Sequence, residues 1–209
     1  MRKNIKIATT FLLFQFYPHL ILTLAFCLIS GCFVSFQNLA ADQSAKVLEM
    51  YVNFVGIILL TPLFIAEQDK EIWRLEQTKK TPMWQNYLVR LVMSLIIGAT
   101  IVTIFLYILK GSDSVVYMKD MWIGGVSEVF FLGSIGFFVS GITNQVVLGY
   151  MAAVMYYAIN IGAHDKFGQL ALFQMTRGEF DFAGWMSLVT VILLAAGIII
   201  REWRSHLRG

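Results

Sequence analysis

The run LVRLVMSLIIGATIVTIFLYIL, residues 88–109, holds a single charged side chain, Arg90. A helix that crosses the hydrocarbon layer of a membrane needs about 20 mostly apolar residues, so this run is long enough to span it. The whole chain of 209 residues is 58% hydrophobic and 14% charged, whereas soluble domains carry about 25% charged residues. Working outward from residues 88–109, five more apolar runs lie at roughly 18–36, 50–66, 122–142, 146–163 and 184–200. The sequence therefore predicts an all-α membrane protein with six transmembrane helices in one transmembrane domain, residues 1–209.

The distribution of lysine and arginine predicts the orientation of these spans. With both termini in the cytoplasm, eleven Lys and Arg residues face inward and five face outward, which is the bias of the positive-inside rule. The opposite orientation inverts this ratio. The inner set is Arg2, Lys3, Lys6, Lys70, Arg74, Lys79, Lys80, Arg90, Arg201, Arg204 and Arg208, and the outer set is Lys46, Lys110, Lys119, Lys166 and Arg177.

Two segments outside the predicted spans are amphipathic: one precedes the first span and the other connects the fifth span to the sixth. Residues 1–17 place Ile5, Ala8 and Leu12 on one helical face, with the basic residues away from it. This pattern predicts a helix in the cytoplasmic interface that ends before Pro18; a frayed basic tail is the alternative. Residues 164–183 have an apolar centre between charged flanks, which favours short helices that dip into the outer leaflet.

The fourth and fifth spans are joined by little more than Thr143–Gln145, which predicts a tight helical hairpin. Small residues recur along both spans, and in lipid such residues allow helix backbones to approach closely. We expect this stripe to pack within the chain, with a subunit interface as the alternative. Its members are Gly133, Gly136, Ser140, Gly141, Gly149 and Ala153.

The loop between the second and third spans, residues 67–87, concentrates charge between two apolar runs. Its first part contains good helix formers and no glycine, and Pro82 ends it. Trp73, Met83 and Trp84 stand among these charges. A purely solvated connector does not explain them, and exposed aromatic and methionine side chains ringed by charge are typical of a docking surface for a partner protein.

Several kinds of chemistry find no support in the sequence. There is no phosphate-binding GxxxxGK[ST] loop, no GxSxG and no HExxH motif. The adjacent pair His164–Asp165 has no nucleophile beside it, and three scattered histidines do not predict a metal site. We therefore expect no catalytic site, cofactor or metal on this chain, and the small net charge of +3 does not suggest nucleic acid.

Three polar residues fall inside predicted spans. Glu128 is a carboxylate about two turns from the outer end of the fourth span, and ionisable groups in a membrane usually face a bundle interior or a water-filled path. It is a candidate for contact with a substrate or a proton, unless the helix begins later and Glu128 lies at the wet interface. Asn53 and Asn160 are weaker candidates, since buried amides often join helices to each other.

Taken together, the layout and the 67–87 loop resemble the permeases of the type-2 ATP-binding-cassette (ABC) exporter family. The resemblance covers the whole chain and is most specific in the loop, where the family shows an acidic start, a helix and a proline-containing turn. It implies that the loop is a coupling helix that docks on a separate ATPase, with Trp73 standing where the family commonly has a glycine. The docking residues would be Asp69, Glu71, Ile72, Trp73, Arg74, Leu75, Glu76 and Pro82.

The resemblance also implies the rest of the assembly. ATP and Mg²⁺ would bind the cytoplasmic ATPase subunit, and a second permease copy or a homologous permease would complete the pathway in the plasma (inner) membrane. The 164–183 segment, including Phe173, would form part of the extracytoplasmic gate. The cargo would be an amphipathic, bacteriocin-like peptide or a hydrophobic drug. The alternatives are a membrane-embedded substrate-binding subunit of an importer, or a membrane enzyme.

Overall fold

The computed structural model describes residues 17–33, 36–68, 83–163 and 166–207, and every regular element in these ranges is a helix. The prediction of an all-α fold is thereby confirmed for the part of the chain described. The first helix in the described part of the chain is α2, Tyr17–Phe33. The second pass is a continuous helical rod made of α3 (Ala41–Val47), the π-helical turn η2 (Leu48–Val52), α4 (Asn53–Leu60) and the 3₁₀ helix η3 (Thr61–Gln68).

Each of the remaining passes is a single α-helix. They are α6 (Met83–Gly111), α7 (Met118–Thr143), α8 (Val146–Ala163) and α9 (Phe182–Leu207). Between α8 and α9 lie two short 3₁₀ helices, η5 (Gly168–Leu170) and η6 (Met175–Arg177). Residues 166–181 are called the α8–α9 segment below.

Four of these helices are long and apolar enough to cross a membrane. They cover Ala41–Ile65, Trp84–Gly111, Met118–Thr143 and Phe182–Trp203, and two shorter apolar helices cover Tyr17–Ser30 and Val146–Gly162. The second pass begins at Ala41, nine residues before the predicted start at 50. Polar residues near its start lower the local hydropathy, although two of them, Ser44 and Glu49, are buried in the protein.

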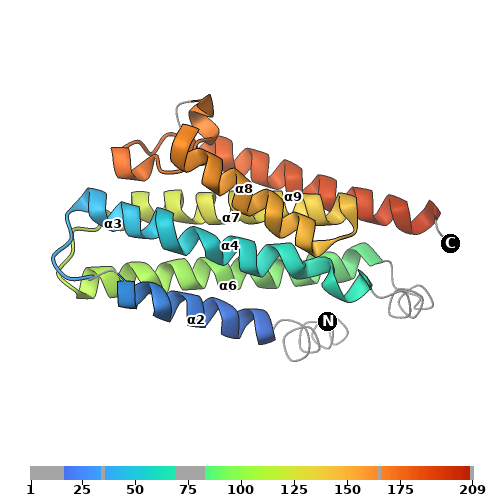
Figure 1. Cartoon of the computed structure of the whole chain (residues 1–209), viewed down its shortest axis with the longest axis horizontal. Coiled ribbons are helices and arrows are strands. Elements are labelled where there is room, and N and C mark those ends of the chain that lie inside the picture. The colour runs from blue at the N-terminus through green and yellow to red at the C-terminus, as the bar shows by residue number, and fades with distance from the viewer. Residues whose placement is uncertain (1–16, 34–35, 69–82, 164–165, 208–209) are drawn as a thin grey trace.

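The helices run up and down, so that the start of α2 and the end of α9 lie at the same end of the bundle (Figure 1). We call this the terminal end; η3 ends there and α6 begins there. The far end carries α3 and the α8–α9 segment, shown in blue and orange in Figure 1.

Two passes form the centre of the bundle. The apolar stretches of the second pass and of α7 are 72% and 67% buried, whereas those of α6 and α9 are 33% and 28% buried. Helix α7 packs on α4, α8 and α9. Exposed side chains of the outer helices are mostly apolar, for example Ile96, Tyr107 and Val191, as expected for surfaces that face lipid.

Glycines bring the central helices into backbone contact. A Cβ added at Gly133 would lie 2.5 Å from the carbonyl oxygen of Gly56, and one added at Gly149 would lie 2.5 Å from that of Gly136. The first contact joins α4 to α7, and the second joins α7 to α8. The predicted packing of the small-residue stripe within the chain is therefore observed at these positions.

The α7–α8 hairpin turns within two residues. Asn144 caps the end of α7. Its φ of 59° is left-handed, and its N–H donates to the carbonyl of Ser140. Asparagine tolerates this conformation better than most residues do. At the same end, the Arg201 guanidinium donates to Oδ1 of Asn144 and lies 5.4 Å from the centre of the Phe64 ring. These contacts tie α9, the hairpin and η3 together at the terminal end.

Candidate functional site

Glu49 is a buried carboxyl residue at the far end of the bundle. It lies in the π-helical turn Leu48–Val52, and π-turns inside α-helices are frequent at functional sites. Its side chain is 0% exposed. Its Oε1 accepts a hydrogen bond from the N–H of Met175 at 2.6 Å, and its Oε2 accepts from the N–H of Thr176 at 3.1 Å and from the Thr176 hydroxyl. Glu49 thus holds η6 against the second pass.

Glu128 approaches the same place from α7. Its side chain is also 0% exposed, and its Oε2 accepts a hydrogen bond from Nδ2 of Asn53 at 2.8 Å. The backbone of Phe173 lies next to this carboxyl. The Glu128 and Glu49 carboxyl groups lie close enough to interact with each other. Two buried carboxyls from different passes therefore meet beneath the α8–α9 segment.

Helix α8 supplies a second set of bonds to the same segment. Oδ1 of Asn160 accepts from the N–H of Leu172 at 3.0 Å, and the Tyr156 hydroxyl donates to the carbonyl of Leu170 at 2.6 Å. Within the segment, Nε2 of Gln174 donates to the carbonyl of Ala171 at 2.9 Å. Several backbone polar groups of this irregular segment are thus paired with side chains.

Phe173 stands at the centre of the segment in a left-handed conformation, with φ of 68°. A non-glycine residue rarely takes this conformation unless the surroundings impose it. Its ring lies 5.4 Å from that of Tyr157, at an interplanar angle of 64°. The hydrogen bonds of the Leu172 N–H to Asn160 and of the Met175 N–H to Glu49 hold the backbone on either side of Phe173.

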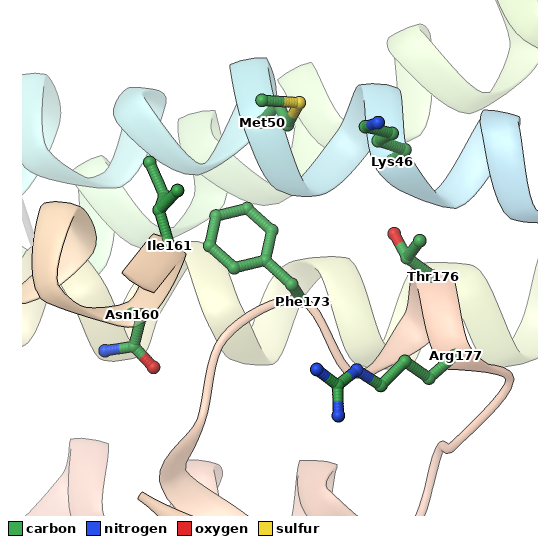
Figure 2. A pocket seen from close by; sticks show the side chains of 7 residues that line it. All are labelled: Lys46, Met50, Asn160, Ile161, Phe173, Thr176 and Arg177. Carbon is green, nitrogen blue, oxygen red and sulfur yellow. The ribbon is translucent and has the colours of Figure 1, made fainter. Parts of the chain in front are cut away.

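A pocket of about 280 Å³ opens beside Phe173. In Figure 2 the Phe173 ring lies between the second pass, which carries Met50, and the end of α8, which carries Ile161. Lys46 and Arg177 stand on opposite sides of the opening (Figure 2). Asn160 and Thr176 complete the lining. The pocket is apolar in its middle and cationic at its rim, and two of its polar lining residues, Asn160 and Thr176, take part in the bonds that hold the α8–α9 segment.

The four residues predicted to line a pathway or gate all lie here. Glu128 and Asn53 bond to each other, Asn160 binds the segment, and Phe173 lines the pocket. Glu128 is ten residues inside α7, which begins at Met118, so the alternative of a wet interface caused by a later helix start does not hold.

The residue that sequence reasoning missed is Glu49. The second span predicted from the sequence begins at residue 50, which places Glu49 in the preceding loop. A signal was present, because Glu49 and Asn53 are four residues apart and share a helical face if the helix starts earlier.

The predicted docking residues, from Asp69 to Pro82, lie outside the described residues, and so do residues 1–16 of the predicted interfacial helix and the pair His164–Asp165. Trp84, at the start of α6, is described and is 42% exposed. Among the residues that the structure describes, no group of three or more His, Cys, Asp or Glu side chains is placed to hold a metal ion.

Comparisons with protein-family models, with curated proteins and with solved structures found no match for this chain.

Proposed function

We propose that this chain is the membrane permease subunit of an ATP-driven exporter. In this proposal the six apolar helices all span the plasma membrane, with the terminal end and the 67–87 loop in the cytoplasm. A separate ABC ATPase binds that loop and hydrolyses ATP with Mg²⁺, and a second permease copy or a homologous permease completes the pathway. The support comes from lysine and arginine placement, the resemblance of the loop, and the construction of the second pass.

The observation that supports the proposal is that one helical rod reaches both ends of the bundle (Figure 1). The second pass runs without a break from Ala41 to Gln68, and its backbone stays right-handed helical through Leu48, Asn53 and Thr61 at the junctions. At the far end it carries Glu49, which binds the α8–α9 segment. At the terminal end it reaches Gln68, which already belongs to the predicted 67–87 loop. A force on the loop therefore has a direct connection to the far end.

Close backbone contacts connect the second pass to α7. Gly56 and Gly133 fix α4 to α7, and at the terminal end the hydroxyl of Ser140 on α7 donates to the carbonyl of Thr61 at 3.3 Å. Packed cores and interfaces change state as units rather than by continuous bending. We expect the second pass and α7 to shift together when the ATPases close, since coupling requires contacts that differ between two states.

The pocket beside Phe173 indicates the kind of cargo. Met50, Ile161 and Phe173 give it an apolar centre, while Lys46 and Arg177 place positive charge at the rim. Such a site suits an amphipathic molecule with an apolar part of moderate size. An amphipathic peptide or a hydrophobic drug remains the proposed cargo class.

Two other functions compete with this one. A substrate-binding subunit of an importer has a similar size and number of spans, but it has no need of the charged 67–87 loop. A membrane enzyme could use a pair of carboxyl groups for acid–base chemistry. In this structure both carboxyls are 0% exposed and bonded to the protein, so a substrate has no access to them.

Co-purification tests the proposal. A cytoplasmic ABC ATPase encoded beside this gene should co-purify with the chain and hydrolyse ATP at a rate that cargo changes. Trp73→Ala, Glu71→Lys and Arg74→Glu should each remove that response by weakening the docked loop, while the permease itself remains folded.

The matched control is Lys119→Glu, a charge reversal at an exposed position of the far end. It should keep normal coupling and ATPase activity. Normal coupling in all three loop variants would contradict the docking role of the loop, and failure of any ABC ATPase to co-purify would contradict the exporter proposal itself.

A further inference from the structure

The contact between Glu49 and Glu128 has a consequence that does not depend on the exporter proposal. Two carboxyl groups can form a hydrogen bond only if at least one of them carries a proton, since an ionised carboxylate is an acceptor alone. Two carboxylates that share a buried site repel each other strongly when both are ionised. The pair in this structure therefore needs a positively charged ligand, and the smallest is a proton.

The hydrogen bonds show which carboxyl holds it. Glu49 accepts three bonds, from two backbone N–H groups and one hydroxyl, and this arrangement stabilises its ionised form. Glu128 is different. Among the described residues, no N–H or O–H group donates to its Oε1, although the side chain is 0% exposed. A proton on Glu128 that is donated to Glu49 gives this oxygen a partner.

Asn53 provides a second, independent indication. Its Nδ2 donates to Glu128, but no donor in the described part of the chain reaches its Oδ1, and the residue is 1% exposed. Buried polar atoms without a partner are rare and call for an explanation such as an unplaced ion or proton. The amide can also rotate to present this oxygen to an O–H of Glu128.

The surroundings contain few other charges. Among the described residues, the phenols of Tyr156 and Tyr157 face the pair, and phenols are uncharged near neutral pH. Lys46 and Arg177 are exposed at the rim of the adjacent pocket.

We propose that Glu49, Glu128 and Asn53 form a proton-binding site that fastens the α8–α9 segment to the bundle. With one proton bound, Glu128 donates to the Glu49 carboxylate, and Glu49 keeps its bonds to Met175 and Thr176. When the proton leaves, the Glu128 O–H bond breaks, its electron pair stays on the oxygen, and the proton passes to water. The pair then carries two negative charges that repel each other, and the segment is released.

The pocket gives this exchange a route. Thr176, which binds Glu49, and Phe173, whose backbone lies next to Glu128, both line the pocket. A displacement of these two residues exposes the carboxyls to the space at the far end. Binding of the proton and attachment of the segment are therefore linked: the segment is attached at lower pH and released as the pH rises.

Amide hydrogen exchange of the full chain in lipid nanodiscs tests the proposal. The readout is the protection of peptides that cover residues 171–177, measured across neutral and alkaline pH and corrected for the intrinsic pH dependence of exchange. One linked proton changes the equilibrium by up to about tenfold per pH unit. We expect protection of the wild-type segment to fall by at least about tenfold in total as the pH rises.

Glu128→Gln supplies an amide N–H to Glu49 without a removable proton. Its segment should stay protected at every pH, whereas Asp120→Asn, an exposed change on the same helix, should behave like the wild type. Protection of the wild-type segment that does not change with pH would overturn the proposal, and so would an unchanged pH dependence in Glu128→Gln. Protection that depends on Na⁺ at constant pH would also overturn it, by assigning the site to sodium.

Infrared spectroscopy of the wild type gives a test that requires no variant. The C=O stretching band of a protonated, non-hydrated carboxylic acid should be present at neutral pH and disappear as the pH rises, in parallel with the loss of protection. Absence of this band at neutral pH would contradict the proposal even if Glu128→Gln failed to fold.

Discussion

At the scale of single residues, the α8–α9 segment depends on three side chains that lie on three different passes. Glu49 holds Met175 and Thr176, Glu128 faces Phe173, and Asn160 binds Leu172. None of these bonds joins neighbours in the sequence. The conformation of the segment is therefore determined by the arrangement of the helices beneath it.

Asn160→Ala tests this dependence at one bond. It removes the acceptor of the buried Leu172 N–H, and an unsatisfied buried donor costs about 1–3 kcal/mol. We expect hydrogen-exchange protection at Leu172 to fall by about 5- to 150-fold, which is that free energy expressed as an equilibrium constant. Gln169→Ala, an exposed change in the same segment, should leave it unchanged. Equal protection in Asn160→Ala and the wild type would show that Asn160 does not hold the segment.

The sequence indicated which polar residues are important, but it did not indicate which of them interact with each other. Glu128, Asn53 and Asn160 were recognisable because a polar side chain inside an apolar run is costly and needs a reason. Glu49 was missed, since it lies among Asp42, Gln43 and Lys46, which resemble a loop in composition. Only the fold reveals that Glu49 turns inward while Asp42 and Lys46 remain exposed.

At the scale of elements, backbone contact through glycine decides how the central helices pack. The Gly56–Gly133 contact joins α4 to α7 where no side chain fits between them. The spacing of small residues predicted close packing of some kind, but it did not identify the partner helices. Pairing depends on the order of the helices around α7, and local sequence does not encode that order.

Gly133→Ala should destabilise the bundle. Its added Cβ would lie 2.5 Å from the carbonyl oxygen of Gly56 and 2.7 Å from Cδ1 of Leu60, and overpacking of this kind costs about 1–3 kcal/mol. Thermal unfolding in detergent, followed by circular dichroism, should show a lower Tm.

The matched control is Gly162→Ala in α8, where an added Cβ meets nothing within 4 Å. Alanine favours a helix by roughly 0.5–1 kcal/mol relative to glycine, so this variant should have an unchanged or slightly higher Tm. If Gly133→Ala and the control have the same Tm, the backbones of α4 and α7 are farther apart at Gly133 than the structure shows.

At the scale of the whole molecule, the up-and-down order places both described ends of the chain on one side of the bundle (Figure 1). Four helices have the length and apolar character of a span, and α2 and α8 are shorter. Our proposal of six spans with a cytoplasmic terminal end rests on the distribution of lysine and arginine.

Single cysteines test this orientation. In a chain with Cys27 and Cys32 replaced by serine, Gly111→Cys at the far end should react with a membrane-impermeant maleimide in intact cells. Gln145→Cys, in the α7–α8 turn at the terminal end, should react only after the membrane is made permeable. Both positions are exposed. The reverse pattern would invert the orientation, and labelling of both in intact cells would contradict the proposed topology.

The central claim is that the second pass links the 67–87 loop to the α8–α9 segment. Hydrogen exchange of residues 171–177 in the complex with the ATPase, with and without ATP, tests it most directly. We predict that ATP changes this exchange in the wild type and in Trp203→Ala, an exposed tryptophan at the terminal end, but not in Trp73→Ala. The claim would be contradicted if ATP did not change the exchange of residues 171–177 in the wild type. It would also be contradicted if ATP changed this exchange equally in Trp73→Ala.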